Sequence, residues 1–420
     1  MPPDDIPSLR QLRIFAAVAA AQSVSGAAKA VNLSQPGVTQ SVRALEQCVG
    51  AELFERRGSG CYLTASGAIL LPRIQRFIDQ LRLALGDAGA GAPDPDVAVH
   101  RITGPHIRSL IAVSENNSFG AAARSLEISQ PSLHRAAKGL EGELRRRLFQ
   151  RTSQGMTTNV QGAEIARRFQ IALREIAYGI EELQAARGHV VSRIVVGNIP
   201  HSGGQILSSA INEFFVAYPT ASVRVIDGHY EALLDDLRAG KLDFLFGVLR
   251  RPAWAQDVSE EALFKNPYVV VARTGHPLSR SKTVGLRELS RYDWIMPGPM
   301  TPRQQAFRHI FAGLPSPPKI SVETTSLQIH RDLLATTDRL TLMSTLEAQL
   351  NDCKLAVLPF RSPGLRRTDG LATRTDWQPT PIHRHFLEVL RTHARRLTAG
   401  VNCEPAARER PASRQSEHVY

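Results

Sequence analysis

The chain contains 420 residues, of which 43% are hydrophobic and 21% charged, so its composition is that of a soluble globular protein with two or three domains. Its first residues include acids and prolines where a signal peptide needs positive charge and an apolar run, and its four cysteines form no C-x-x-C pair, which disfavours secretion, a disulfide framework and a structural zinc site. We therefore expect a cytoplasmic protein with no cofactor and no membrane association, whose net charge of +12 favours a polyanionic partner such as DNA.

Two stretches of the first half, residues 9–85 and 104–187, repeat one sequence pattern at a constant offset of 95 residues. No insertion or deletion interrupts the register. The recurring motifs include Ser34-Gln35-Pro36 as Ser129-Gln130-Pro131, Leu45-Glu46 as Leu140-Glu141, and Leu53-Phe54-x-Arg56 as Leu148-Phe149-x-Arg151. We therefore expect two copies of one fold, each with the order helix, helix, tight turn, helix, wing and long helix.

The third helix of the first copy is predicted to read DNA. Val38, Val42 and Leu45 recur at helical spacing and face the core, so the polar positions between them face outward. An exposed row of hydrogen-bonding side chains on such a helix suits the major groove, and arginines on the wing suit phosphate or the minor groove; a solvated helix face and a basic surface turn are the simpler alternatives. The predicted DNA contacts of this copy are Ser34, Gln35, Pro36, Thr39, Gln40, Arg43, Arg56 and Arg57.

The second copy keeps the apolar frame and changes the outward residues. Leu133, Ala137 and Leu140 remain apolar. The predicted DNA contacts are Ser129, Gln130, Pro131, His134, Arg135, Lys138 and Arg151. If both copies bind DNA, they should read different sequences.

Each copy ends in a long helix with an apolar stripe that only another helix can cover. The stripes comprise Ile74, Ile78, Leu81 and Leu85 in the first copy, and Ile165, Phe169, Ala172, Ile176, Ile180 and Leu183 in the second. One hypothesis is that the two stripes pack on each other within a chain, which would create a pseudo-dimer of reading heads. Residues 86–103 between the copies have the Gly, Ala, Pro and Asp content of a flexible linker.

The first copy also places Ser23, Ala27-Ala28 and Thr64-x-x-Gly67 around the recurring motifs. Together these residues resemble the winged helix-turn-helix of LysR-type transcriptional regulators. The second copy departs from the family pattern because Arg145 replaces Gly50 and Asn159 replaces Thr64. The position of Gly50 favours a left-handed backbone, which would strain an arginine. We therefore expect the reading helix of the second copy to continue past Arg145 and tilt the wing.

From Arg193 onward, short apolar strands alternate with helices, which predicts a parallel sheet with right-handed crossovers. Tyr218-Pro219, His276-Pro277-Leu278 and residues 234–243 and 370–381 resemble the effector domain of the same family. The resemblance implies two lobes of periplasmic-binding-protein architecture. One would hold residues 191 to about 270 with the end of the chain, and the other the middle to about Leu355.

In such sheets a ligand lies beyond the carboxyl ends of the strands, where helices begin. Backbone N–H groups and hydroxyls there suit an anionic or hydroxylated small molecule, although capping and turn chemistry explain any single residue equally well. The predicted effector contacts are His201, Ser202, Gly203, Gly247, Thr301 and Thr325. His383, His385 and His393 have the spacing of a basic surface stretch rather than of metal ligands, and no metal site is expected.

The predicted architecture is α and α/β multidomain: two tandem winged helix-turn-helix domains with linker helices, followed by a two-lobed periplasmic-binding-protein-like α/β effector domain. The expected boundaries are 1–85, a linker at 86–103, 104–188, 189–402 and a disordered tail at 403–420. The resemblance implies a sequence-specific regulator, not an enzyme, that binds double-stranded DNA and a small-molecule effector, forms a homo-dimer or tetramer and contacts RNA polymerase. The alternative is a small-molecule-binding protein whose helical repeats serve oligomerisation without reading DNA.

Overall fold

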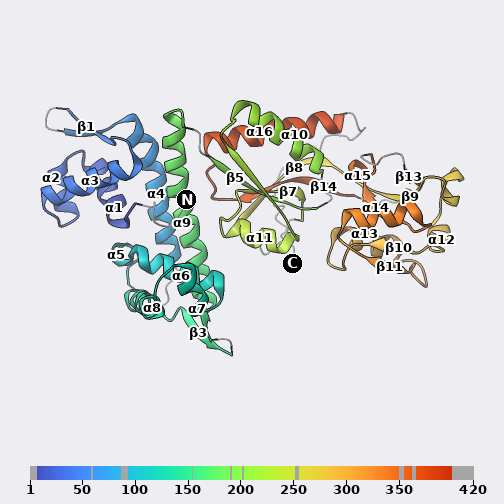
Figure 1. The fold of residues 1–420 in the computed structure, drawn as a ribbon, viewed down its shortest axis with the longest axis horizontal. Coiled ribbons are helices and arrows are strands. Elements are labelled where there is room, and N and C mark those ends of the chain that lie inside the picture. Colours follow the sequence, from blue (N-terminus) through green and yellow to red (C-terminus); the bar gives the residue numbers. More distant parts are fainter. Residues whose placement is uncertain are drawn as a thin grey trace, which may run out of the picture.

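A computed structural model describes residues 7–57, 60–86, 93–153, 155–189, 192–200, 203–250, 255–349, 354–361 and 366–399. Helical modules occupy one side of the molecule and β-sheets the other, with two long helices, α4 (Ala65–Gly86) and α9 (Val160–Ala186), running side by side between them (Figure 1). Within the described ranges, no helix is both long and apolar enough to cross a membrane. The predicted tail at 403–420 lies outside the described residues.

The first helical module contains three short helices, a hairpin and α4. Its elements are α1 (Leu9–Ala21), α2 (Val24–Ala30), α3 (Gln35–Val49), β1 (Phe54–Arg57) and β2 (Gly60–Leu63), in that order before α4. Ser8, Ser23 and Ser34 cap the three short helices through their side chains. Pro36 occupies the first turn of α3, where a missing N–H costs nothing.

The second helical module repeats that order at the same offset. Its elements are α6 (Gly104–Asn116), α7 (Phe119–Ser125), α8 (Gln130–Leu144), β3 (Phe149–Thr152), β4 (Gly155–Thr158) and α9. In both modules a glutamate on the third helix accepts the backbone N–H that leads into the hairpin: Leu53 donates to Glu46 at 2.8 Å, and Leu148 donates to Glu141 at 2.7 Å. The paired Leu-Glu and Leu-Phe motifs of the sequence therefore join the third helix to the wing.

The substitution of Asn159 for Thr64 preserves a local contact. Thr64 donates to the carbonyl of Glu52 at 2.7 Å and accepts from Gly67 N at 3.1 Å. Asn159 makes the equivalent pair of bonds, donating to the carbonyl of Arg147 and accepting from Gly162 N, both at 2.8 Å. The amide carries both a donor and an acceptor, so it replaces the hydroxyl without altering the start of the long helix.

The expectation that α8 continues past Arg145 is wrong. α8 ends at Leu144, the position that corresponds to the end of α3 at Val49, and Arg145 adopts a left-handed φ of 51° where Gly50 has 69°. The backbone N–H of Arg145 bonds to the carbonyls of Glu141 and Gly142, so the surrounding turn holds an arginine in a region that favours glycine.

Part of the expected flexible linker is helical. Within residues 86–103, α5 (Pro95–Arg101) begins with a cap from Asp94 and buries Ala98 and Val99. Arg13 of α1 donates to the carbonyl of His100 at 2.8 Å and so ties this helix to the first module. The composition indicated a loop because Gly, Ala, Pro and Asp dominate it, but a capped Asp-Pro start and two apolar residues suffice for two helical turns.

The two long helices pack against each other within the chain, in opposite directions. Leu70 and Arg73 of α4 lie against Gly179 of α9, where an added Cβ would come within 2.9 Å of the Leu70 side chain. The apolar stripes of both helices belong to one continuous core, which also contains residues of both modules, although Ile78 is only partly buried. The intrachain pairing considered from the sequence is therefore the arrangement found here.

The sheets of the second half form two groups. The first sheet has the order β6-β5-β7-β14-β8, with bounds β5 (Arg193–Asn198), β6 (Ser222–Asp227), β7 (Phe244–Val248), β8 (Val258–Lys265) and β14 (Thr368–Arg374). Only β5, β6 and β7 are parallel; β14 runs antiparallel to both its neighbours, so the sheet is mixed rather than purely parallel. α10 (Gly204–Ala217) and α16 (Pro381–Ala399) cover one face, and α11 (Tyr230–Arg238) covers the other.

The second group combines a three-stranded sheet, β12-β9-β13, with the parallel pair β10-β11. The strands are β9 (Tyr268–Arg273), β10 (Trp294–Met296), β11 (Ile320–Glu323), β12 (Thr341–Ser344) and β13 (Leu355–Val357). The accompanying helices are a short 3-10 turn (Pro277–Arg280), α12 (Leu286–Leu289), α13 (Pro302–Phe311), α14 (Leu327–Thr336) and α15 (Thr345–Gln349). A separate core around Trp294, Phe307 and Phe311 holds this group together.

A buried polar cluster joins α9 to the first sheet. Asp243, just before β7, accepts from Tyr178 of α9 and lies 3.3 Å from the Arg174 guanidinium and 3.2 Å from the His383 imidazole. His383 is fully buried, so its assignment to a basic surface stretch is wrong: it lies on the face of α16 that packs on the sheet. The nearby cations and hydroxyl hold the pKa of Asp243 well below its usual range despite burial.

Candidate nucleic-acid interface and ligand cleft

The outward face of α3 is solvent-exposed, as a DNA-reading face requires. Val38 and Leu45 are fully buried and Val42 nearly so, whereas Gln35, Gln40 and Arg43 are exposed and Thr39 is half-buried. Ser34 caps the helix by accepting from Gly37 N at 3.3 Å, so its hydroxyl is committed to local structure while its position at the helix start remains accessible.

The wing borders the same surface. A groove of about 850 Å³ runs between α3, the start of α2 and the hairpin, and its lining includes Gln35, Pro36, Thr39, Gln40, Arg43 and Arg56. Arg57 is exposed beside this groove, with an ion pair to Glu55 at 2.7 Å that water screens strongly. Six of the eight residues predicted to contact DNA in the first copy thus line one concave surface.

The predicted contacts of the second copy are exposed as well. Gln130, Pro131, Arg135 and Lys138 face outward on α8, and Arg151 is exposed on β3. Ser129 caps α8 by accepting from Ser132 N at 3.3 Å. The ring of His134 stacks on Phe119, with centroids 4.4 Å apart, so this side chain is held in place more firmly than the Thr39 that corresponds to it.

A second cavity, of about 250 Å³, lies between the two groups of sheets. It is lined by the carboxyl ends of several strands: Ile199 and Pro200 after β5, residues 227–230 after β6, Pro297 after β10 and Thr325 after β11. Tyr268, at the start of β9, and Thr301, which caps α13, complete this side of the wall. We call this cavity the cleft.

The structure brings two of the six predicted effector residues to the cleft, Thr301 and Thr325. Gly203 and Gly247 are buried elsewhere: an added Cβ on Gly247 would come within 2.6 Å of Ile199, so this glycine serves close packing. His201 and Ser202 lie outside the described residues. Thr301 also caps α13, accepting from Gln304 N at 3.3 Å, and capping was the alternative to ligand binding that the sequence offered for this residue.

Three arginines that were not singled out in the sequence line the cleft: Arg250, Arg303 and Arg367. Each has an acidic partner outside the lining, at 2.5 Å for Glu231, 2.6 Å for Glu347 and 2.7 Å for Asp369. The Arg303 and Arg367 guanidinium groups also lie 5.9 and 5.4 Å from the centre of the Tyr268 ring. Burial acts to lower the pKa of Arg367, but Asp369 and Tyr268 outweigh it and raise this pKa above its ordinary value, so the group stays cationic.

No sequence signal distinguishes these arginines from the many others in the chain. The turn at residues 227–230 could have been found, because it follows the predicted strand that ends at Asp227. A ligand is expected beyond the carboxyl end of this strand, as beyond the others.

Comparison with known proteins agrees with this geometry. The family model described as "Bacterial regulatory helix-turn-helix protein, lysR family" matches residues 9–68 and again 105–163, and that described as "LysR substrate binding domain" matches residues 187–395. The HTH-type transcriptional regulator GalR of Pseudomonas putida is 31% identical over 90% of this chain and 95% of its own length. The HTH-type transcriptional regulator PcaQ of Agrobacterium fabrum is 27% identical over 71% of this chain and 97% of its own length.

Among solved structures, a full-length OxyR variant from Pseudomonas aeruginosa has the same fold, with a TM-score of 0.52 at 20% identity over 73% of this chain and 98% of its own. The relationship to GalR spans nearly the whole of both proteins. The chain belongs to the LysR family of DNA-binding transcriptional regulators with a substrate-binding effector domain.

Proposed function

We propose that this regulator reads DNA with two tandem winged helix-turn-helix heads that one chain pairs through α4 and α9. The observation that carries the proposal is the shared core of these two helices, which links both modules inside one polypeptide. The alignment with GalR leaves only 10% of this chain uncovered, fewer residues than either module contains, which supports the proposal. We further propose the boundaries 1–85, 104–188 and 189–402 for the three functional units, with the sheet groups as two lobes.

The two heads carry different contact sets, so the operator would have two unlike halves. The first head presents Gln35, Gln40 and Arg43, which pair with base edges through amide and guanidinium donors. The second presents Arg135 and Lys138 at the positions of Gln40 and Arg43, so it has two positive charges there where the first head has one. Arg56 and Arg57 on one wing and Arg151 on the other would neutralise phosphates.

Single-head variants test this proposal. Arg43→Ala and Arg135→Ala should each weaken binding to selected DNA by about tenfold or more, because a good base contact contributes roughly 1–3 kcal/mol. Arg151→Ala should reduce the slope of the logarithm of the binding constant against the logarithm of the salt concentration by about one. The reduction should be the same for every DNA sequence. Wild-type affinity and salt slope in all three variants would favour the alternative in which the modules serve oligomerisation alone.

The cleft is the proposed effector site, for a molecule smaller than most drug-sized ligands. The guanidinium groups of Arg250 and Arg303 each have five N–H donors, more than their acidic partners occupy, Arg367 adds a third positive charge, and Thr301 and Thr325 add hydroxyls. An effector with a carboxylate or hydroxyl acceptor fits this lining. Contact with RNA polymerase is also proposed, from family membership.

Matched small ligands test the cleft. Benzoate and succinate should raise the melting temperature of the full chain more than benzamide and succinamide, because only the acids accept charge-assisted hydrogen bonds. Thr325→Val should reduce that difference, whereas Thr336→Val, at the end of α14, should leave it unchanged. Equal shifts for acids and amides would contradict an anion-binding cleft.

A further inference from the structure

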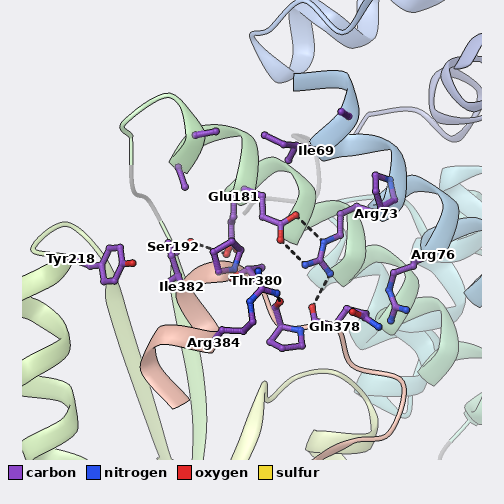
Figure 2. Close-up of a pocket in the computed structure, with 17 residues that line it drawn as sticks. Ile69, Arg73, Arg76, Glu181, Ser192, Tyr218, Gln378, Thr380, Ile382 and Arg384 are labelled. Carbon is purple, nitrogen blue, oxygen red and sulfur yellow. Dashed lines mark hydrogen bonds and ion pairs between the residues drawn. The ribbon is translucent and has the colours of Figure 1, made fainter. Parts of the chain in front are cut away.

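A cavity of about 610 Å³ lies where three parts of the chain meet: α4 of the first module, α9 of the second, and residues 378–384 at the start of α16 (Figure 2). It shares no lining residue with the cleft. Ser192, before β5, and Tyr218, after α10, complete the wall. We call this space the junction cavity.

The body of the junction cavity is apolar. Its wall includes Ile69 and Pro72 of α4, Ala185 of α9, and Pro381 and Ile382 of α16. Apolar side chains from three separate segments would together enclose the hydrocarbon part of a ligand, and their burial would stabilise the complex roughly in proportion to the area covered.

One cation at the edge of the junction cavity is suited to an anion. Arg384 is exposed and donates to the carbonyl of Pro379 at 2.6 Å, and no carboxylate lies within ion-pair distance of it among the residues that the structure describes. Arg73 differs, because its guanidinium already bonds to Glu175, Glu182 and the carbonyl of Gln378. Glu181, in the same wall, lies 3.7 Å from the Arg174 guanidinium, which compensates its negative charge.

The hydrogen-bond ladder of α4 is interrupted at the same place. Pro72 lies inside the helix and has no N–H, so the carbonyl of Ala68 receives no bond from the residue four positions later. Both residues line the junction cavity. The position that corresponds to Pro72 in the second module is Arg167, so this opening in the helical ladder is particular to α4.

We propose that the junction cavity is a second ligand site, distinct from the cleft, for a small amphipathic organic acid whose acidic group pairs with Arg384 and whose apolar body lies between α4 and α9. A donor group on the ligand would bond to the Ala68 carbonyl. Because the walls belong to both modules and to the effector domain, a bound ligand stabilises one relative arrangement of these parts over others.

The test uses the full chain and the fluorescent probe 1-anilinonaphthalene-8-sulfonate, which has an aromatic body and one anionic group. We expect saturable binding of one probe per chain. Ala68→Trp, which fills the junction cavity from an exposed position on α4, should weaken it at least tenfold, whereas Ala65→Trp, on the same helix but outside the lining, should not. Arg384→Gln should weaken binding about tenfold and Arg384→Lys less, because a hydrogen-bonded charge contributes roughly 1.5–3 kcal/mol.

Two further variants keep the proposal falsifiable. If Ala68→Trp unfolds at a lower temperature than Ala65→Trp, Ala186→Trp fills the junction cavity from the exposed side of α9 instead and should have the same effect. Equal affinity in the filled and control variants would overturn the proposal. So would loss of binding in Thr325→Trp, which obstructs the cleft, combined with normal binding in Ala68→Trp and Ala186→Trp.

Discussion

At the scale of single residues, Gly67 and Gly162 fix the start of each long helix against the turn that precedes the wing. An added Cβ would lie 2.2 Å from the carbonyl oxygen of Leu53 in one module and of Leu148 in the other. A backbone carbonyl cannot rotate away as a flexible side chain can. The position therefore requires glycine because of close approach, and the two modules share this requirement.

Gly162→Ala should destabilise the protein by about 1–3 kcal/mol, since the turn must shift to accommodate the methyl group. Gly142→Ala on α8 is the matched control, because open space surrounds that position and alanine favours the helix by about 1 kcal/mol. Urea unfolding of both variants measures the difference. Equal midpoints for the two variants would show that the close contact carries no strain.

Asp243 should make the stability of the protein sensitive to acid. Its folded pKa is lowered, so its stabilising contribution is complete above the ordinary carboxyl pKa of about 3.9 and is lost as the pH falls through the folded value. Asp243→Asn should cost roughly 3 kcal/mol at pH 7, because Arg174 and His383 lose a buried partner. The difference from wild type should shrink as the pH falls below about 4.

Unfolding at pH 7, 5 and 3.5 measures this effect, with Asp235→Asn on the exposed side of α11 as the control. A constant difference between wild type and Asp243→Asn at all three values would show that the carboxylate charge does not stabilise the fold.

The residues that the sequence predicts best are those with helical periodicity. The helical spacing of Val38, Val42 and Leu45 predicted that these side chains are buried and that Gln40 and Arg43, on the opposite face, are exposed, as the structure has them. The cleft arginines and His383 were not predicted, because their environment is created by strands and helices far apart in the chain. The rule that a left-handed position requires glycine failed at Arg145. Its backbone N–H bonds to two carbonyl oxygens, and these bonds hold it in a left-handed conformation.

At the scale of elements, the contact between α4 and α9 determines how the modules are joined. Arg73 is almost fully buried and pairs with Glu175 at 2.9 Å and Glu182 at 2.7 Å. Arg73, Arg76 and Gln80 also contact residues 376–378, which lead into α16. One face of α4 thus packs on the second module and on the effector domain, so α4 connects the first module directly to both.

Arg73→Met should destabilise the protein by about 3–5 kcal/mol, because two glutamates lose their partner and Glu175 is buried. Arg82→Met, which removes exposed ion pairs with Asp79 and Asp96, should cost at most about 1 kcal/mol. The effect of Arg73→Met should not depend on protein concentration, since the pair lies within one chain. Recovery of stability at high concentration would instead indicate a contact between chains.

The amphipathic stripes predicted that these two helices need partners, and pairing within one chain was a hypothesis that the sequence raised but could not decide. Gly179 resolves the local geometry, because it permits the close approach of Leu70 and Arg73. The mixed order of the first sheet was also beyond prediction: β14 returns from the end of the chain and pairs with β7 and β8, which no local pattern encodes.

At the scale of the whole molecule, the two helical modules project from the paired helices, and the effector domain lies on the other side of that pair (Figure 1). The modules share a backbone frame and differ at the outward positions of α3 and α8. A homodimer of single-headed chains would favour two identical half-sites, whereas one chain with two unlike heads favours two different ones.

Selection of binding sites from random duplex DNA tests this difference most directly. The proposed pairing predicts a motif with two unlike halves for the wild type, loss of one half with Gln40→Ala plus Arg43→Ala, and loss of the other with Arg135→Ala plus Lys138→Ala. A palindromic motif that survives disabling of the second head would contradict it.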